Sequence, residues 1–140
     1  MKSFENCSYK TTKPYYPDFK EALVVKVYDA DTFWIVAPIN GVMYRFSARL
    51  YGVDAPEMKD QNLDIRNKAK NATKIVSDMI LNKVVNVIIH NGQKKDGKVV
   101  TEKFGRLLIT LTIDGIDLAN YLVQMGLVKS YFGGTKELFK

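Results

Sequence analysis

Cysteine and histidine are scarce in this sequence of 140 residues, which contains one of each. The single cysteine, Cys7, excludes an internal disulfide and a metal site built from thiolates. The single histidine, His90, follows an alternating apolar pattern and is typical of a residue at the end of a strand. Catalysis must therefore depend on carboxylate, arginine, lysine or tyrosine side chains, and a metal ion would need oxygen ligands.

Long hydrophobic runs are also missing, since stretches such as Val87-Ile88-Ile89 extend over only a few residues. A helix that crosses a bilayer needs roughly 20 apolar residues, so we expect no membrane segment and no membrane partner. The first residues of the chain are charged and lack the apolar core of a secretory signal. We therefore expect an intracellular protein.

The composition is that of a folded domain that binds a polyanion. Hydrophobic residues make up 46% of the chain, which has no internal repeat and a length suited to one domain. The formal net charge of +6 favours a partner such as nucleic acid, although many enzymes are equally basic. We expect a monomer with an N-terminal extension over residues 1–20 and one domain over residues 21–140.

Alternation of apolar and polar residues predicts five strands after the extension. The first strand starts near Glu21, and Asn40-Gly41 supplies a hairpin turn between the second and the third. On the third strand, Phe46, Ala48 and Leu50 should face the core. The other predicted strands cover residues 33–37, 42–50, 84–90 and 104–113, with a polar loop over residues 91–101.

Two segments have the three- and four-residue spacing of an amphipathic helix. Apolar residues recur from Ile65 to Ile80 on one stripe. A final helix should start at an N-cap at Asp117, end at a C′ glycine at Gly126, and bury Leu118, Leu122 and Met125.

This order of elements predicts the fold class. Three strands, a helix, two strands and a final helix give an α+β fold that is mainly β. We expect a five-stranded OB-fold barrel with a helix between strands three and four and a C-terminal helix. Such barrels often bind oligonucleotides, but a fold does not by itself establish an activity.

Two acidic clusters stand at strand ends, Asp29-Ala30-Asp31-Thr32 and Asp54-Ala55-Pro56-Glu57. Each could be no more than a turn or the start of a helix. In a meander of three strands, however, Asp31 and Asp54 reach the same end of the barrel, where their repulsion would destabilise a metal-free protein. An all-oxygen site with the Ala55 carbonyl as a third ligand would favour Ca²⁺ over Mg²⁺ or Mn²⁺.

Two arginines should lie on the same rim of the barrel. Arg49 is five residues before Asp54, and Arg106 is expected on the fifth strand beside Phe104. The arginine fork suits a phosphate because it donates two parallel charge-assisted hydrogen bonds. The alternative interpretation is a solvated barrel exterior with surface salt bridges.

Together these residues resemble the staphylococcal nuclease (thermonuclease-like) family, over roughly residues 22–132. The combination is specific because four separate motifs agree in order and spacing. They are Asp29-Ala30-Asp31-Thr32, Phe46-x-x-Arg49-Leu50-x-x-Val53-Asp54-Ala55-Pro56-Glu57, Lys103-Phe104-Gly105-Arg106 and Leu122-Val123-x-x-Gly126-Leu127.

The resemblance implies a calcium-dependent nuclease that cleaves DNA and RNA and leaves 5′-hydroxyl and 3′-phosphate ends. It makes Asp31, Asp54 and the Ala55 carbonyl the calcium ligands, and Glu57 the residue that acts on the attacking water. Arg49 and Arg106 would hold the scissile phosphate. Lys103, Phe104 and Tyr131 would bind the nucleic acid, with stacking on Phe104 favouring single strands over duplex DNA.

Two rival functions remain open on the sequence alone. A domain of the same fold could bind nucleic acid without catalysis, but such domains usually lack several of the five chemical side chains present here. A plain single-strand-binding barrel is disfavoured because Asp31, Asp54 and Glu57 would repel a phosphate.

The sequence departs from the family pattern at two positions. Ala55 stands where the family often has a hydroxyl residue, and Phe104 stands where it often has a tyrosine.

Overall fold

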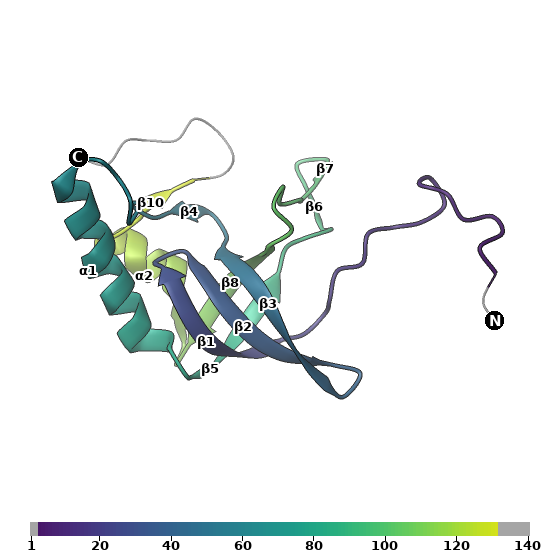
Figure 1. Ribbon diagram of the computed structural model, residues 1–140, viewed down its shortest axis with the longest axis horizontal. Helices are drawn as coiled ribbons and strands as arrows, with labels where there is room; N and C mark the ends of the chain where they lie inside the picture. The colour runs from purple at the N-terminus through teal and green to yellow at the C-terminus, as the bar shows by residue number, and fades with distance from the viewer. Residues whose placement is uncertain (1–2, 132–140) are drawn as a thin grey trace.

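The computed structural model describes residues 3–131, which form a β-barrel with two helices on one side (Figure 1). The barrel strands are β1 (Glu21–Asp29), β2 (Thr32–Ile39), β3 (Val42–Leu50), β5 (Val84–Ile89) and β8 (Leu107–Ile113). The helices are α1 (Leu63–Ile80) and α2 (Leu118–Gln124). The short strands are β4 (Val53–Asp54), β6 (Lys94–Lys95), β7 (Lys98–Val99), β9 (Ile116–Asp117) and β10 (Lys129–Ser130).

One parallel strand pair closes the barrel. The antiparallel order β3-β2-β1-β5-β8 would leave an open sheet, but β3 also pairs with β8, with Arg49 opposite Leu108. This closed five-stranded barrel and the position of α1 between β3 and β5 confirm the predicted OB-type fold. Closure matters for the site because it sets the end of β3 beside the start of β8.

The core consists of the inward faces that alternation predicted. Ala48 and Leu50 of β3 are fully buried, and Phe46 is packed against the same cluster. The predicted stripe of α1 is confirmed, since its buried residues are Ala69, Ala72, Val76 and Ile80. Asn62 caps this helix by accepting hydrogen bonds from two backbone N–H groups of the first turn.

The final helix is confirmed at both ends and at two of the three residues of its predicted buried face. The Asp117 side chain accepts from the Asn120 N–H, and Gly126 follows the C-cap with φ +71°. Leu118 and Leu122 are buried as predicted. The burial predicted for Met125 is wrong, because its side chain is 58% exposed.

The fifth strand starts later than predicted, at Leu107 rather than at Phe104. The backbone N–H groups of Phe104 and Arg106 both donate to the Glu102 carboxylate, which turns the chain there. Gly105, at φ +77°, completes that turn. Arg106 therefore lies just before the barrel strand, and the loop over residues 91–101 contains the small hairpin of β6 and β7.

The last part of the N-terminal extension packs on the barrel. Pro17 and Phe19 are buried, and the Phe19 ring lies 5.3 Å from the Phe46 ring, centroid to centroid. The Lys20 carbonyl accepts a hydrogen bond from the Val87 N–H. Among residues 3–131, no helix is long and apolar enough to cross a membrane.

Candidate active-site cleft

Two turns bring Asp31 and Asp54 together at one end of the barrel. Asp31 lies between β1 and β2, and its carbonyl accepts the Leu50 N–H at 2.8 Å, which ties this turn to the end of β3. The chain then reverses at Gly52, at φ +82°, and places Asp54 on β4. The predicted proximity is confirmed by a second contact, since the Ala55 N–H donates to Asp31 Oδ2 at 3.2 Å.

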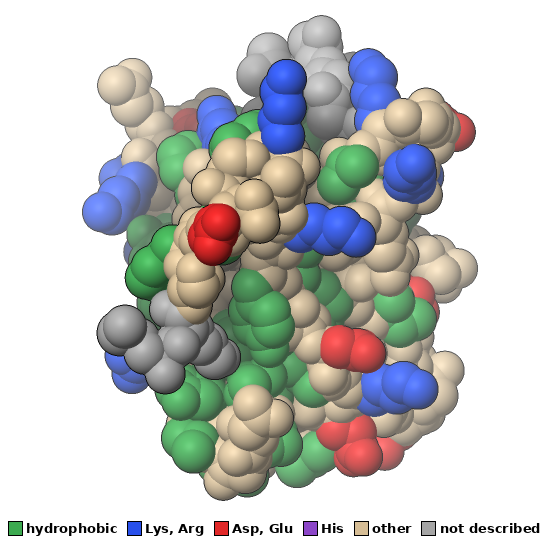
Figure 2. Space-filling model, turned by 90° about the vertical axis from the view of Figure 1, so that its right-hand side faces the viewer, with side chains coloured by type: hydrophobic (Ala, Val, Ile, Leu, Met, Phe, Trp, Pro, Cys, Tyr) green, Lys and Arg blue, Asp and Glu red, His purple; other side chains and the backbone are tan. Residues whose placement is uncertain are grey.

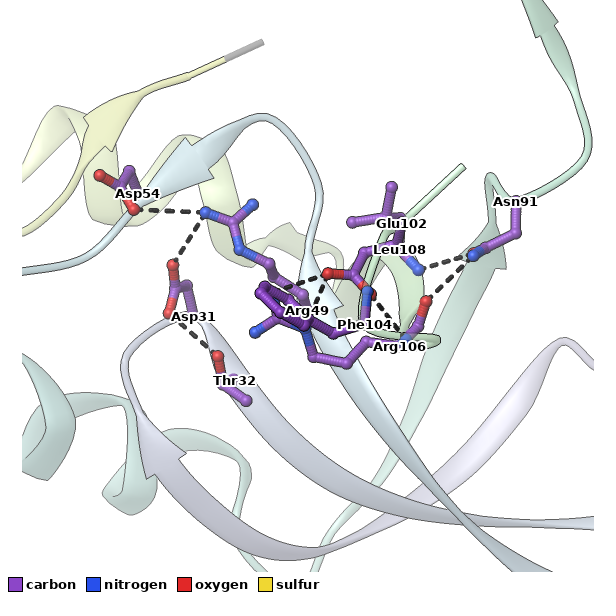
Figure 3. A network of polar contacts seen from close by, with 9 residues as sticks. All are labelled: Asp31, Thr32, Arg49, Asp54, Asn91, Glu102, Phe104, Arg106 and Leu108. Carbon is purple, nitrogen blue, oxygen red and sulfur yellow. Dashed lines mark hydrogen bonds and ion pairs between the residues drawn. The ribbon is translucent and has the colours of Figure 1, made fainter. Parts of the chain in front are cut away.

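The Arg49 guanidinium lies between the two carboxylates (Figure 3). Its Nη2 atom is 3.4 Å from Asp31 Oδ2 and 3.2 Å from Asp54 Oδ1. All three side chains are largely buried, so this attraction is weakly screened. The expected repulsion of two uncompensated aspartates in the metal-free protein is therefore wrong, because Arg49 supplies the cation that the pair needs.

Asp29 is a third carboxylate beside this cluster. Its Oδ1 atom accepts the Asp31 N–H at 3.1 Å. Burial, with a hydrogen bond to Asp31 and the charge of that neighbour, raises the pKa of Asp29 to about 7. The local negative charge is thus limited because a proton on Asp29 offsets part of it at neutral pH.

Arg106 is held by a carboxylate that the sequence analysis missed. Glu102 Oε1 accepts from Arg106 Nε at 3.1 Å and from Nη2 at 2.8 Å. Burial acts to raise the pKa of Glu102, but hydrogen bonds from Arg106 and the Phe104 N–H, with the Arg106 charge, outweigh it and leave that pKa lowered. The sequence offered one signal, a Glu four residues before an Arg. That spacing indicates a side-chain pair only within a helix, and no helix is predicted there.

Asn91 is a second residue that the sequence did not indicate. Its side-chain nitrogen donates to the Arg106 carbonyl at 3.0 Å, and its oxygen accepts the Leu108 N–H at 2.6 Å. Asn91 is buried, so these bonds are shielded from water. Asn91 and Glu102 together fix the backbone on both sides of Arg106.

Both arginines line one cleft with a volume of about 680 Å³, together with Asp54 and Glu102. Of the predicted site residues, it brings together Arg49, Asp54, Lys103, Phe104, Arg106 and Tyr131. The Phe104 ring is 70% exposed, with the Arg106 guanidinium 5.4 Å from its centroid. Across the cleft the Arg49 guanidinium lies 5.8 Å from the Tyr131 ring. A basic cleft with two aromatic faces is suited to a nucleotide.

Asp31, Ala55 and Glu57 lie outside the lining of this cleft. Asp31 and Ala55 are buried behind Arg49 and Asp54. Glu57 lies on the exposed turn that leads from β4 to α1, and its carbonyl accepts the Asp60 N–H. The roles predicted for these three residues remain predictions.

The donor chemistry at this end of the barrel fits a hard cation. Asp31 and Asp54 present carboxylate oxygens to one positively charged atom, and hard ions such as Ca²⁺ take oxygen ligands. Within residues 3–131, no group of three His, Cys, Asp or Glu side chains is close enough to enclose a metal ion. A cation here would therefore complete its coordination with backbone oxygen, water and substrate.

The Arg49→Met variant tests the bridge between the carboxylates. Removing the guanidinium leaves two buried carboxylates facing each other, so we expect the free energy of unfolding to fall by about 3 kcal/mol in metal-free buffer. Urea unfolding in the presence of a chelator measures this change. Arg45→Met, at an exposed position of β3, loses only a cation–π contact with Trp34 and should change stability by no more than about 1 kcal/mol. Equal midpoints for the two variants would contradict the bridge.

The Glu102→Gln variant tests the clamp on Arg106. Because the folded state lowers the pKa of Glu102, its charge stabilises the fold above the unfolded-state pKa. This stabilisation is lost as the pH falls through the folded-state pKa. We expect the variant to be less stable by about 2 kcal/mol at pH 7, and the difference from wild type to shrink towards zero in acid.

Unfolding free energies of both proteins measured between neutral and acid pH give this difference directly. Glu21→Gln, at an exposed position of β1, is the control and should follow wild type throughout. If Glu102→Gln has a free energy of unfolding that is lower than that of wild type by the same amount at every pH, then the shape of the side chain, and not its charge, accounts for the lost stability.

The family comparison agrees with this geometry. The family described as staphylococcal nuclease homologue matches residues 47–138, from the second half of β3 onward. A comparison with curated proteins finds no match. The matched region contains both arginines of the cleft, Asp54 and Phe104, while Asp31 precedes it. Because the match covers more than half of its length, the chain belongs to the staphylococcal nuclease homologue family.

Proposed function

We propose that this protein is a calcium-dependent nuclease that hydrolyses phosphodiester bonds in single-stranded DNA and RNA. Duplex DNA would be cut more slowly, and the products would carry 5′-hydroxyl and 3′-phosphate ends. One observation carries the proposal. Arg49 and Arg106 line the same cleft as Asp54 and the exposed Phe104 ring, so phosphate-binding, cation-binding and base-stacking groups meet in one place.

The two arginines act on the scissile phosphate in this proposal. A guanidinium can donate two parallel hydrogen bonds to phosphoryl oxygens and oppose the charge that grows as water attacks phosphorus. Glu102 fixes the Arg106 guanidinium by accepting hydrogen bonds from two of the guanidinium nitrogens. Less reorganisation of Arg106 is then needed when substrate binds. Arg49 is held differently, through one nitrogen, Nη2, that contacts both Asp31 and Asp54.

The acidic residues divide into two roles. Asp31, Asp54 and the Ala55 carbonyl would hold calcium, which when bound neutralises charge on a non-bridging phosphoryl oxygen. Glu57 would orient or deprotonate the attacking water, because its exposed turn follows Asp54 by three residues and stays open to solvent. Its distance along the chain from Asp54 matches the motif on which the family resemblance depends.

The aromatic residues explain the expected preference for single strands. Phe104 and Tyr131 offer ring faces on which a base can stack without regard to its identity. A base in a duplex must first leave its own stack, which costs free energy. Lys103 lies 4.9 Å from the Phe104 ring and adds positive charge at the entrance.

A second candidate function is nucleic-acid binding without catalysis. It is favoured by the engagement of both guanidiniums with carboxylates and by the position of Glu57 outside the cleft lining. The same cleft would then bind a single strand and leave it intact. Cleavage assays separate the two candidates.

Metal removal is the first test of the nuclease. Incubation of labelled single-stranded DNA or RNA with protein and calcium should give shortened products, because calcium offsets the negative charge of the phosphate under attack. Excess chelator should abolish cleavage, and added calcium should restore it. Undiminished cleavage in chelator would exclude the metal from the reaction, and binding without cleavage in calcium would support the second candidate.

The Glu57→Gln variant tests the assignment of the group that acts on water. Turnover should fall by about 10²- to 10⁴-fold, with little change in the affinity for single-stranded DNA. Asp60→Asn is the matched control on the same turn, since its side chain still accepts the Asn62 N–H, and it should retain wild-type turnover. Equal losses in both variants would mean that the turn as a whole, and not the Glu57 carboxylate, is required.

A further inference from the structure

A second hollow of about 370 Å³ lies between the N-terminal extension and the barrel. Tyr15 and Tyr16 form one wall, Phe46 and Ser47 of β3 form another, and the turn at Glu102 and Gly105 forms the third. We call this hollow the aromatic pocket. Its volume is within the range of roughly 300–1,000 Å³ that is usual for small-molecule sites, and such sites are mostly apolar with a few polar groups.

The wall formed by the extension is anchored to the barrel. The Tyr16 ring packs against the backbone at Gly92, where an added Cβ would lie 2.7 Å from the Tyr16 Cδ2 atom. Pro17 is buried next to it, and the Phe19 ring contacts the Phe46 ring. Tyr15 lines the pocket beside Tyr16 and is itself 74% exposed, so its side chain is accessible to a ligand.

The aromatic pocket adjoins the cleft that would bind the scissile phosphate. Glu102 lines both hollows, and the turn from Glu102 to Gly105 separates them. Phe104 and Arg106 are on the cleft side of this turn, whereas Gly105 lines the aromatic pocket. A strand whose phosphate lies between the arginines therefore needs to advance only past this turn to place a neighbouring base against Tyr15.

Positive charge continues beyond the aromatic pocket. Arg45 is two residues before Ser47 on the outward face of β3, a separation of about 7 Å along a strand. Its guanidinium lies 5.2 Å from the Trp34 ring, in a cation–π contact. Arg45 would thus supply a cation to a phosphate that lies farther along β3 than the bound base. Most of the other Lys and Arg side chains visible in Figure 2, which shows the face at the right of Figure 1, lie on its upper half, toward the end of the molecule where Figure 1 has β6 and β7.

We propose that the aromatic pocket is a second nucleobase subsite, which binds a base of the single strand adjacent to the nucleotide in the cleft. The inference rests on the proposed nuclease function and extends it to substrate length. A base is planar, neutral and apolar on its faces, so it can stack on Tyr15, while the Ser47 hydroxyl can donate to or accept from its edge. The N-terminal extension is then part of the substrate-binding surface.

The test compares binding of a mononucleotide and of a longer single strand by Tyr15→Ala and wild type. Affinities for a labelled thymidine mononucleotide and for a labelled oligothymidylate of eight nucleotides are measured by fluorescence anisotropy in chelator, which prevents turnover. We expect the variant to bind the longer strand about tenfold more weakly, as for the loss of one stacked base, and the mononucleotide, which fills the cleft alone, equally well. Tyr15→Phe keeps the ring and should bind like wild type.

Two further measurements keep the result interpretable. Tyr9→Ala removes another tyrosine of the extension that is 96% exposed and lines neither hollow, so it should leave both affinities unchanged. Urea midpoints should agree for all variants because Tyr15 is exposed.

Equal binding of the long strand by Tyr15→Ala and wild type, or an equal loss of affinity for both ligands, overturns the subsite alone. Wild-type protein that binds neither ligand in chelator and cleaves no single strand in calcium overturns the proposed function as well.

Discussion

The contact of Arg49 with Asp31 and Asp54 is the constraint on which this end of the barrel depends. Two buried carboxylates destabilise a fold unless a positive charge lies between them, and here one guanidinium contacts both. The contact also joins three consecutive parts of the meander, because Asp31 precedes β2, Arg49 is on β3 and Asp54 is on β4. The proposed cation site and the proposed phosphate-binding arginine thereby share one cluster, in which a metal ion and Arg49 would attract the same oxygens.

The second arginine is positioned on the same principle but by other means. Arg106 is outside regular structure, so no ladder of backbone hydrogen bonds holds it. Glu102 binds its guanidinium and its N–H, and Asn91 binds its carbonyl. Both arginines of the cleft are therefore preorganised by carboxylates, which limits their motion and directs their charge before substrate is present. The family match across residues 47–138 places this arrangement within a nuclease family.

Barrel closure determines which surfaces can act together. The parallel pairing of β3 with β8 sets Arg49 opposite Leu108, two residues beyond Arg106. The same pairing leaves the first half of β3 without β8 beside it, and the N-terminal extension packs there through Phe19 and Phe46. The extension thus covers apolar surface that closure leaves open, and it adds aromatic side chains next to the turn that carries Arg106. Stability and the proposed second subsite have the same structural origin.

The amino-acid sequence by itself determined the strands, the buried stripe of α1, both ends of α2 and the pairing of the two acidic turns. The first three depend on periodicity and on capping residues a few positions apart, which are local, and the last follows from the meander that the same periodicity predicts. Tertiary structure alone decided the bridge by Arg49, the clamp from Glu102 and Asn91, and the start of β8 at Leu107. The Arg49 bridge and the Asn91 hydrogen bonds depend on side chains that meet only when the strands pack together. The Glu102 clamp and the start of β8 depend on a carboxylate that competes with a strand for backbone N–H groups. Spacing along the chain contains no information about that competition, because its outcome is set by burial and by the loss of water around the charged groups.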